Sequence, residues 1–187
     1  IFHVAGQSSG EISFDNPVYD LQTNAQSTLL LLELALKIKC TKFIYASTMS
    51  IYGDQKEMPV NEDVVLNPKS FYGVGKIASE HYMRVYQQYG INSTALRLFN
   101  IYGPGQNLKN LKQGMVSIFI AQAINSKNVH VKGSKLRFRD FVFIDDVVDA
   151  FILAYQDKKN SFKVVNISSG IKTTIENLIF IIKKYLP

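Results

Sequence analysis

The chain has 187 residues, 47% of them hydrophobic, so it can bury a core as one domain or as one domain and part of a second. Its net charge of +6 comes mostly from lysines scattered over polar segments, with only four arginines and no basic stripe interleaved with aromatic residues, which argues against nucleic-acid binding. No apolar run approaches the roughly 20 residues that span a bilayer, and the single cysteine, Cys40, excludes a disulfide framework and has no partners at metal-ligand spacing, so we expect no metal site.

Strand-like and helix-like segments alternate over the first hundred residues. In chain order, we predict a strand at residues 1–5, a helix at 17–39, a strand at 41–47, a helix at 71–89 and a strand at 93–99. Strands separated by such helices pair in parallel. The fold class that this pattern predicts is α/β, with a doubly wound parallel sheet of Rossmann type.

The pattern is looser after Asn100. We predict a Gly/Pro turn at 103–105, a polar loop to 113, a helix to about 126, a short strand at 129–131, an extended basic strand to 143, a helix at 145–155, a strand at 163–167 and an amphipathic helix from 174. These elements predict part of a smaller α/β unit, together with a strand and a helix that return to the main sheet.

Three pairs of tyrosine and lysine stand four residues apart, a spacing that places both side chains on one face of a helix. Two of the pairs have unsuitable surroundings: Lys56 falls in a polar loop after Tyr52, and Tyr155 with Lys159 falls at a solvated helix end. Only Tyr72 with Lys76 opens a long amphipathic helix. A cation near a phenol favours the phenolate and lowers the phenol's pKa, so the pair predicts a proton-transfer site.

Polar loops follow the three predicted strands of the first hundred residues. They are residues 5–8, 47–50 and 100–103. Ligands of open parallel sheets bind beyond the carboxyl ends of the strands. Turn formation alone explains Gly, Ser and Asn in any one loop, but three loops at corresponding positions favour a shared site.

These residues together resemble the extended short-chain dehydrogenase/reductase family, in particular its NAD-dependent sugar-nucleotide epimerases and dehydratases of the UDP-glucose 4-epimerase kind. The resemblance covers nearly the whole chain and rests on six motifs. They are His3-Val4-Ala5-Gly6 with Pro17 and Asn24, the run from Phe43 to Thr48 leading to Ile51-Tyr52-Gly53, Tyr72 with Lys76, Arg97-Leu98-Phe99-Asn100 leading to Tyr102-Gly103-Pro104, Arg139-Asp140-Phe141 leading to Ile144-Asp145-Asp146, and Asn166-Ile167-Ser168-Ser169-Gly170.

The resemblance implies a role for each matching position. Tyr72 is implied as the catalytic acid/base, Lys76 as the residue that lowers the pKa of Tyr72 and binds the nicotinamide ribose, and Thr48 as a hydrogen-bond partner of the reacting sugar oxygen. The implied cofactor-binding positions are Ala5, Gly6, Gln7, Asn24, Ser47, Tyr72, Lys76 and Phe99. The implied substrate-binding positions are Ser8, Thr48, Asn100 and Arg139, of which Asn100 and Arg139 hold the pyrophosphate of a nucleoside diphosphate sugar.

Arg139 also has a rationale in the local sequence. Lys135, Arg137 and Arg139 alternate with Leu136 and Phe138, which on an extended strand puts three cations on one face. Arginine binds a pyrophosphate through two parallel hydrogen bonds. An edge strand that charge keeps soluble is the alternative interpretation.

The two residues after Thr48 narrow the choice among the reactions that the resemblance implies. Family dehydratases carry an acidic pair, or at least a glutamate, there, and this chain has Met49 and Ser50. We therefore expect a 4-epimerase, in which the sugar is transiently oxidised to a keto sugar. A related dehydratase, reductase or decarboxylase, or a catalytically inert truncated fragment, stays open as an alternative.

The chain begins without methionine inside an apolar run, and no G-x-x-G-x-x-G occurs in it. We expect residues 1–100 to be the C-terminal portion of the NAD-binding domain with the catalytic pair, and 101–187 to contribute the substrate-binding subdomain and a returning strand and helix of the core. NADP is not excluded. For the full-length protein we expect carbohydrate metabolism such as polysaccharide biosynthesis, a homodimer, no membrane association and a cytoplasmic location.

Overall fold

The computed structural model describes residues 1–159 and 161–186, and the chain divides into two compact units. The first unit comprises Ile1–Leu98 and Val148–Ile167, and the second comprises Phe99–Val147 and Ser168–Pro187. The backbone therefore leaves the first unit after the third strand of its sheet, returns to it within a helix, and leaves it again.

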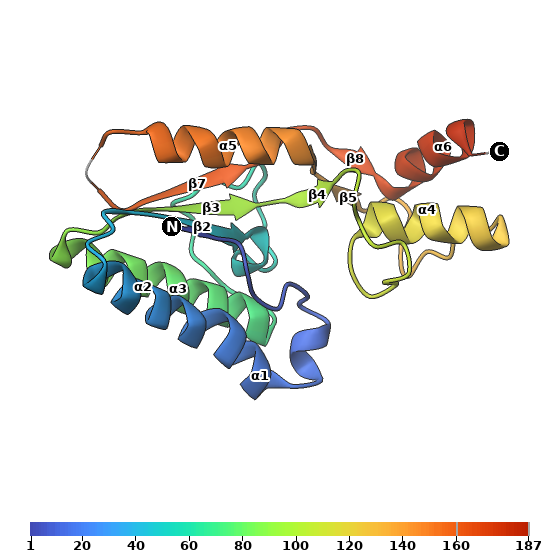
Figure 1. Cartoon of the computed structure of the whole chain (residues 1–187). Coiled ribbons are helices and arrows are strands. Elements are labelled where there is room, and N and C mark those ends of the chain that lie inside the picture. Colours follow the sequence, from blue (N-terminus) through green and yellow to red (C-terminus); the bar gives the residue numbers. More distant parts are fainter. Residues whose placement is uncertain (160, 187) are drawn as a thin grey trace. The chain divides into compact units, whose positions relative to one another are not determined.

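A parallel sheet of four strands forms the centre of the first unit (Figure 1). In spatial order its strands are β1 (Phe2–His3), β2 (Lys42–Thr48), β3 (Asn92–Leu98) and β7 (Lys163–Ile167). Every neighbouring pair is parallel. The predicted α/β class with a Rossmann-like parallel sheet is confirmed, although the first strand is shorter than the predicted 1–5.

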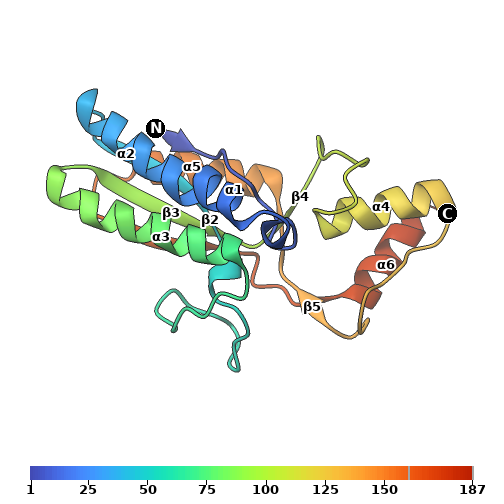
Figure 2. The ribbon, with the colours of Figure 1, turned by 90° about the horizontal axis from the view of Figure 1, so that it is seen from below.

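Helices cover both faces of this sheet (Figures 1 and 2). On one face lie α1 (Pro17–Leu21), α2 (Ser27–Lys37) and α3 (Phe71–Tyr86), and on the other lies the part of α5 (Ile144–Gln156) that belongs to this unit. The predicted helix at 17–39 is confirmed, with a π-helical turn at Gln22–Gln26 between α1 and α2. Within the described residues, no helix has the length and apolarity to cross a membrane.

The ends of α3 follow from its sequence. The Ser70 side chain caps the N-terminus by accepting a hydrogen bond from the Gly73 amide at 3.1 Å. At the other end a short 3₁₀ segment, Gln87–Tyr89, leads to Gly90, whose φ of 85° is the left-handed conformation that ends many helices. The predicted helix at 71–89 is thus confirmed, and its beginning places Tyr72 and Lys76 in the first two turns.

The core of the first unit lies between the sheet and the helices α2 and α3. Its fully buried members are Leu32, Ala35, Phe43, Tyr45, Met83, Ile91 and Ala95. Strand β2 is buried on both faces along most of its length, as expected for a central parallel strand. The strand that carries Thr48 at its carboxyl end is therefore held rigidly.

The second unit contains two small sheets and two helices. Strand β4 (Asn100–Tyr102) pairs in parallel with β6 (Phe141–Phe143), and β5 (Phe138–Arg139) pairs antiparallel with β8 (Thr173–Thr174). Helix α4 (Met115–Ser126) packs on α6 (Ile175–Tyr185) around a separate apolar cluster. Phe119, Ile175, Leu178 and Ile182 are buried in that cluster.

Two predicted strands of the second unit are wrong. Residues 129–131 form no strand; Val129 and Val131 instead pack against the apolar cluster from a loop. The predicted basic strand is replaced by a turn at Lys135 and Leu136, followed by β5 and β6, which pair with different partners. Lys135, Arg137 and Arg139 therefore do not share one face of an extended strand. Alternation of side chains gives a periodicity but no pairing partner, so it could not separate a strand from an irregular segment.

Candidate active site

The candidate catalytic residues come from the carboxyl end of β2 and from the start of α3. Thr48 is the last residue of β2, and its hydroxyl accepts a hydrogen bond from the Ser50 amide at 3.1 Å. Gly73 allows the two elements to approach, because a Cβ at that position would lie 2.9 Å from the Ser50 carbonyl oxygen. The absence of a side chain at Gly73 therefore brings Tyr72 close to Thr48.

The side chains of Tyr72 and Thr48 lie close enough to interact, because the Thr48 hydroxyl lowers the pKa of Tyr72 against the effect of burial. Both residues are buried, at 8% and 6% relative exposure. Two hydroxyls held together at the end of a parallel strand can transfer a proton to or from one ligand oxygen placed between them. The structure thus brings together the predicted acid/base and its predicted partner.

Lys76 lies one turn further along α3 and is also buried, at 5% exposure. Its ammonium group donates a hydrogen bond to the Ala46 carbonyl oxygen at 3.0 Å and stands 4.6 Å from the centre of the Tyr45 ring. Its Nζ is 5.6 Å from the centre of the Tyr72 ring. Burial lowers the pKa of Lys76 to about 8, against the opposing influence of the Asp20 and Glu80 carboxylates.

The pKa of Tyr72 is shifted upward, whereas the sequence predicted a downward shift. Burial raises the pKa of the Tyr72 phenol above its ordinary value, the Thr48 hydrogen bond opposes this, and the Asp20 charge adds to it. The helical spacing of Tyr72 and Lys76 gave their proximity correctly, but a spacing carries no information about desolvation. In this structure Tyr72 is accordingly a neutral phenol at physiological pH, a proton donor.

The loop after β1 lies beside this centre and is partly open to solvent. Ala5, Gly6 and Ser8 are exposed, and Gln7 is half-buried. Gly6 has a φ of 140°, and a Cβ there would lie 2.6 Å from Asn24 Oδ1. Only glycine therefore fits at this position.

Asn24 and Gln7 hold the loop in place. The Asn24 side-chain amide donates to the Gln7 carbonyl oxygen at 3.0 Å, while Asn24 Oδ1 is buried without a hydrogen-bond partner among the residues described. Gln7 Nε2 donates to the Ser9 carbonyl oxygen at 2.7 Å and to Asp20 at 2.8 Å. The side chains of Gln7 and Asn24 are thus engaged in fixing the loop.

His3 is a buried histidine of the same region. Its Nε2 lies 3.0 Å from the Thr28 hydroxyl, and its Nδ1 is buried without a partner in the described part of the chain. Burial, aided by the charge of Lys76, lowers the pKa of His3 to about 4, so the ring is neutral at physiological pH. Its role here is to pack beneath the loop.

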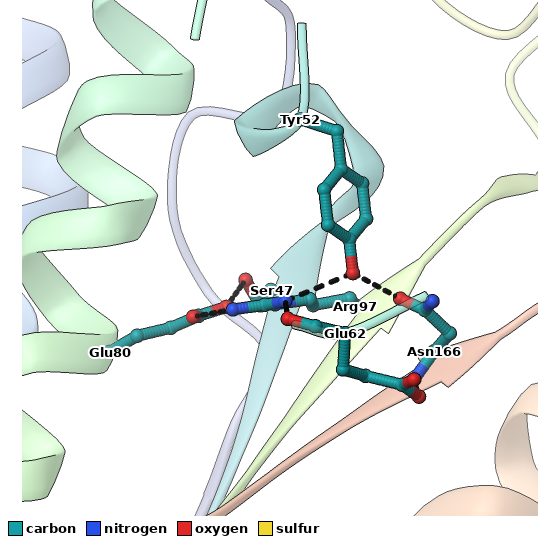
Figure 3. A network of polar contacts seen from close by, with 6 residues as sticks. All are labelled: Ser47, Tyr52, Glu62, Glu80, Arg97 and Asn166. Atoms are coloured by element: carbon teal, nitrogen blue, oxygen red, sulfur yellow. Dashed lines mark hydrogen bonds and ion pairs between the residues drawn. The ribbon is translucent and has the colours of Figure 1, made fainter. Parts of the chain in front are cut away.

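The sequence did not single out a buried ion pair next to the site. Arg97 on β3 and Glu80 on α3 form two hydrogen bonds, at 2.8 and 3.2 Å, with side chains only 4% and 5% exposed (Figure 3). The Ser47 hydroxyl donates to Glu80 at 2.5 Å. In the sequence, Arg97 appears only as part of a motif of the family resemblance. Nothing about Glu80 except its position on the helix indicates that it is buried or paired with Arg97.

The same network reaches the segment that follows β2. Arg97 donates to the Tyr52 hydroxyl at 2.9 Å and to the Glu62 carbonyl oxygen at 2.9 Å, and Tyr52 donates to Asn166 on β7 at 2.6 Å (Figure 3). The Asn166 amide donates to the Glu62 carboxylate at 2.7 Å. Ser47, a predicted cofactor-binding residue, thus uses its hydroxyl to complete this framework.

The remaining predicted site residues, Phe99, Asn100 and Arg139, belong to the second unit. Asn100 donates from Nδ2 to the Asp140 carbonyl oxygen at 2.8 Å. The Asp140 carboxylate accepts hydrogen bonds at 2.8 Å from the Ser169 amide, the Ser169 hydroxyl and the Gly170 amide. Asp140 therefore ties the segments of Asn100 and Arg139 to the turn after β7.

Arg139 is a half-buried cation. It donates to the Phe138 carbonyl oxygen at 2.8 Å, and no carboxylate makes an ion pair with it in residues 1–159 and 161–186. Burial, reinforced by the nearby charge of Arg137, lowers the pKa of Arg139 below its ordinary value. An anion beside Arg139 would offset both the cost of burying its charge and the repulsion from Arg137.

Formal charge is divided unequally between the units. The first unit has eleven Lys and Arg against eleven Asp and Glu, and the second has ten against four. The entire net charge of +6 therefore belongs to the second unit, which also holds Asn100 and Arg139.

Comparison with known proteins identifies the family. Residues 1–168 match the model of the NAD dependent epimerase/dehydratase family. A UDP-glucose 4-epimerase of Mycolicibacterium smegmatis is 33% identical over 95% of this chain, and a dTDP-4-dehydro-6-deoxyglucose reductase of Escherichia coli is 30% identical over 96%.

A solved structure shows the same fold. The crystal structure of UDP-glucose 4-epimerase with UDP-glucose from Thermotoga maritima is 37% identical, with a TM-score of 0.92 over 98% of this chain. The chain spans 57% and 56% of the two curated relatives and 59% of the solved one. The chain belongs to the NAD-dependent epimerase/dehydratase family.

Proposed function

We propose that the protein containing this chain is an NAD-dependent epimerase that acts on a nucleoside diphosphate sugar through a transient keto sugar. The observation that carries this proposal is the burial of Tyr72, Thr48 and Lys76 together at the carboxyl end of β2, with the Lys76 ammonium 5.6 Å from the centre of the Tyr72 ring. These three side chains supply what a reversible alcohol oxidation needs from a protein: a proton acceptor and donor, a group that orients the oxygen, and a cation.

In the proposed reaction each residue has one task. The phenolate form of Tyr72, not the neutral phenol that predominates in this structure, takes the proton of the sugar hydroxyl as the carbonyl forms, and Tyr72 returns the proton when the carbonyl is reduced on its other face. Thr48 donates a hydrogen bond to the same oxygen, and the Lys76 charge stabilises the Tyr72 phenolate while it exists. NAD, when bound, supplies the reversible hydride acceptor.

The residues of the first unit fit that cofactor. Ala5 and Gly6 are exposed, and the buried Asn24 Oδ1 next to Gly6 has no hydrogen-bond partner in the part of the chain that is described. The Lys76 ammonium has three N–H donors and uses one of them on Ala46, so it can donate to ribose hydroxyls. Ala5, Gly6, Gln7 and Lys76 are the residues we propose to line the nicotinamide side of the cofactor.

The residues after Thr48 favour epimerisation over dehydration. Met49 and Ser50 begin a 3₁₀ turn, and Thr48 caps it by accepting a hydrogen bond from the Ser50 amide. Neither side chain can act as an acid or base at neutral pH, which elimination of water would require. Epimerisation needs no such group beyond Tyr72.

A reductase is the second candidate, because a dTDP-4-dehydro-6-deoxyglucose reductase is among the relatives of similar identity. One experiment separates the two activities. In one reaction the natural full-length protein is incubated with NAD and UDP-glucose, the sugar nucleotide of the Thermotoga relative. In a second reaction it is incubated with NADH and dTDP-4-dehydro-6-deoxyglucose, the keto sugar in the name of the Escherichia coli relative. Product is followed by NMR of the sugar protons. We expect interconversion of the C4 epimers without net consumption of NADH. Consumption of one NADH for each keto sugar reduced, with no interconversion, would support the reductase instead.

The substrate class rests on Arg139 and on the positive charge of the second unit. We expect Arg139→Ala to weaken binding of a UDP-sugar at least about tenfold, since a charge-assisted hydrogen bond contributes on the order of 1.5–3 kcal/mol. Binding of the free sugar should change little. Calorimetry with both ligands measures this, and Lys109→Ala, an exposed cation of the same unit, is the control. Equal weakening for sugar and nucleotide sugar would remove Arg139 from the pyrophosphate site. The homodimer and the cytoplasmic location stay predictions.

A further inference from the structure

Asp20 is a buried carboxylate in the catalytic region that the proposed reaction does not use. It lies on α1 and is 1% exposed. Its Oδ1 accepts hydrogen bonds from Gln7 Nε2 at 2.8 Å and Asn24 Nδ2 at 3.2 Å. Both donors are neutral amides, so the charge of the carboxylate is not neutralised by its hydrogen-bond partners. A buried charge with no ion-pair partner is costly unless a cation lies near.

The other oxygen of Asp20 faces α3 next to Lys76. A Cβ on Gly75, the residue that precedes Lys76, would lie 3.6 Å from Asp20 Oδ2. Helices α1 and α3 pack directly against each other, and glycine at this position keeps their backbones close. The carboxylate thus lies buried against the turn of α3 that carries Lys76, and among the described residues it makes no direct ion pair with the ammonium.

We propose that Asp20 is a positioning residue for Lys76: its carboxylate keeps the buried lysine in the ammonium form and, through Gln7 and Asn24, holds the loop after β1 beside that ammonium. This inference rests on the proposed function for its catalytic meaning, because the ammonium matters through Tyr72 and the cofactor ribose. The arrangement itself is a property of the folded chain.

Several other groups surround Lys76, and only one of them could replace Asp20 as counter-charge. The titratable or charged groups that face Lys76 are Tyr72 and Glu80 from α3, Asp20 from α1, His3 from β1 and Tyr45 from β2. Tyr45 and His3 are neutral at physiological pH because burial raises the pKa of the first and lowers that of the second. Glu80 is an anion, but its charge is matched by the Arg97 guanidinium and further bound by Ser47. Of these two anions, Asp20 is therefore the one whose charge can act on Lys76 without being matched by Arg97.

The electrostatics agree with this geometry. Of the two carboxylates that raise the pKa of Lys76 against the effect of burial, Asp20 has the larger influence. The effect is reciprocal: burial raises the pKa of Asp20, and the charge of Lys76 lowers it again. A lysine with a pKa of about 8 has little margin before it loses its proton near physiological pH.

The test is Asp20→Asn in the natural full-length protein. The variant keeps an oxygen that can accept from Gln7 and Asn24 and removes only the charge. The pKa of Lys76 is measured from the pH dependence of its ¹³Cε NMR signal, assigned by its loss in Lys76→Met. We expect the pKa of Lys76 to fall by about one pH unit or more, since a near carboxylate shifts a partner by this amount. Asp54→Asn, which removes an exposed acid of the same unit, should leave it unchanged.

If the protein has the proposed epimerase activity, the pH dependence of kcat/KM gives a second measurement of the effect of Asp20→Asn. In Asp20→Asn the alkaline decline of kcat/KM should move to lower pH together with the Lys76 signal, and at a pH well below that decline the rate should recover most of the wild-type value. A rate that is reduced equally at every pH, with an unshifted Lys76 signal, would assign Asp20 a purely structural role and overturn the proposal.

A reciprocal measurement covers the case in which Asp20→Asn does not fold. The ¹³Cγ signal of Asp20 is titrated in the wild type and in Lys76→Met, where loss of the cation should raise the pKa of Asp20. An identical Asp20 titration in the two proteins would show that the charges do not interact, and would refute the proposal. Because neither NMR titration requires turnover, absence of epimerase activity would count against the proposed function alone.

Discussion

Tyr72→Phe is expected to lower turnover by at least about 10²-fold, the scale on which loss of a positioned general acid/base acts. The Tyr72 side chain is buried, at 8% exposure, and phenylalanine fills nearly the same volume, so the fold should persist while the proton carrier is lost. Steady-state kinetics of the natural full-length protein measure the effect. We expect kcat to fall far more than KM rises, because the proton transfer belongs to the transition state.

Tyr155→Phe is the matched control. Tyr155 has a lysine four residues later, as Tyr72 does, but it is 59% exposed near the end of α5. It should retain wild-type kcat. If Tyr72→Phe turned over like the wild type while circular dichroism showed both variants folded, Tyr72 would have no part in the reaction.

Glu80→Gln should destabilise the first unit by about 3–5 kcal/mol, the usual effect of removing one partner from a buried ion pair. The change leaves the Arg97 guanidinium buried without its counter-charge, and it weakens the hydrogen bond from Ser47 (Figure 3). Chemical denaturation followed by circular dichroism gives the free energy of unfolding. We expect the midpoint to fall with little change in the slope of the transition.

Asp157→Asn provides the comparison for the ion pair. It removes the carboxylate of the Lys163–Asp157 pair, whose side chains are 29% and 31% exposed. Such solvent-accessible pairs contribute little to stability because water screens the two charges, so the unfolding midpoint should hardly move. A loss of similar size in Glu80→Gln and Asp157→Asn would mean that burial does not strengthen the Arg97–Glu80 pair.

The sequence predicted the parallel sheet and its principal helices because each had a clear physical signal. Pro17 and Gly90 mark the start of one helix and the end of another, and the apolar run from Phe43 reads as a strand buried on both faces. The second unit was harder. The alternation of Val129, His130 and Val131 looks like a strand, but among the described residues no strand pairs with this segment.

The site residues that a short sequence motif identifies were predicted. Those whose role depends on burial in the folded chain were missed. The spacing of Tyr72 and Lys76, together with Thr48 at a strand end, was enough to bring the three residues together. Asp20 and Glu80 sit on helices among other polar residues, and only the folded chain shows that both are buried. The raised pKa of Tyr72 has the same origin, because desolvation depends on every neighbour and not on one spacing.

The unequal division of charge has a consequence for how a substrate would reach the protein. A nucleotide sugar carries its negative charge on the diphosphate, and the first unit, with equal numbers of acids and bases, exerts no net long-range attraction on it. The second unit, with its excess of six positive charges, does. For the proposed nucleotide-sugar substrate, this unit would raise the rate of encounter, and its contribution would fall as added salt screens the attraction over about 10 Å. The rate of encounter would thus depend on the charges of the second unit, and the rate of the chemical step on residues of the first unit.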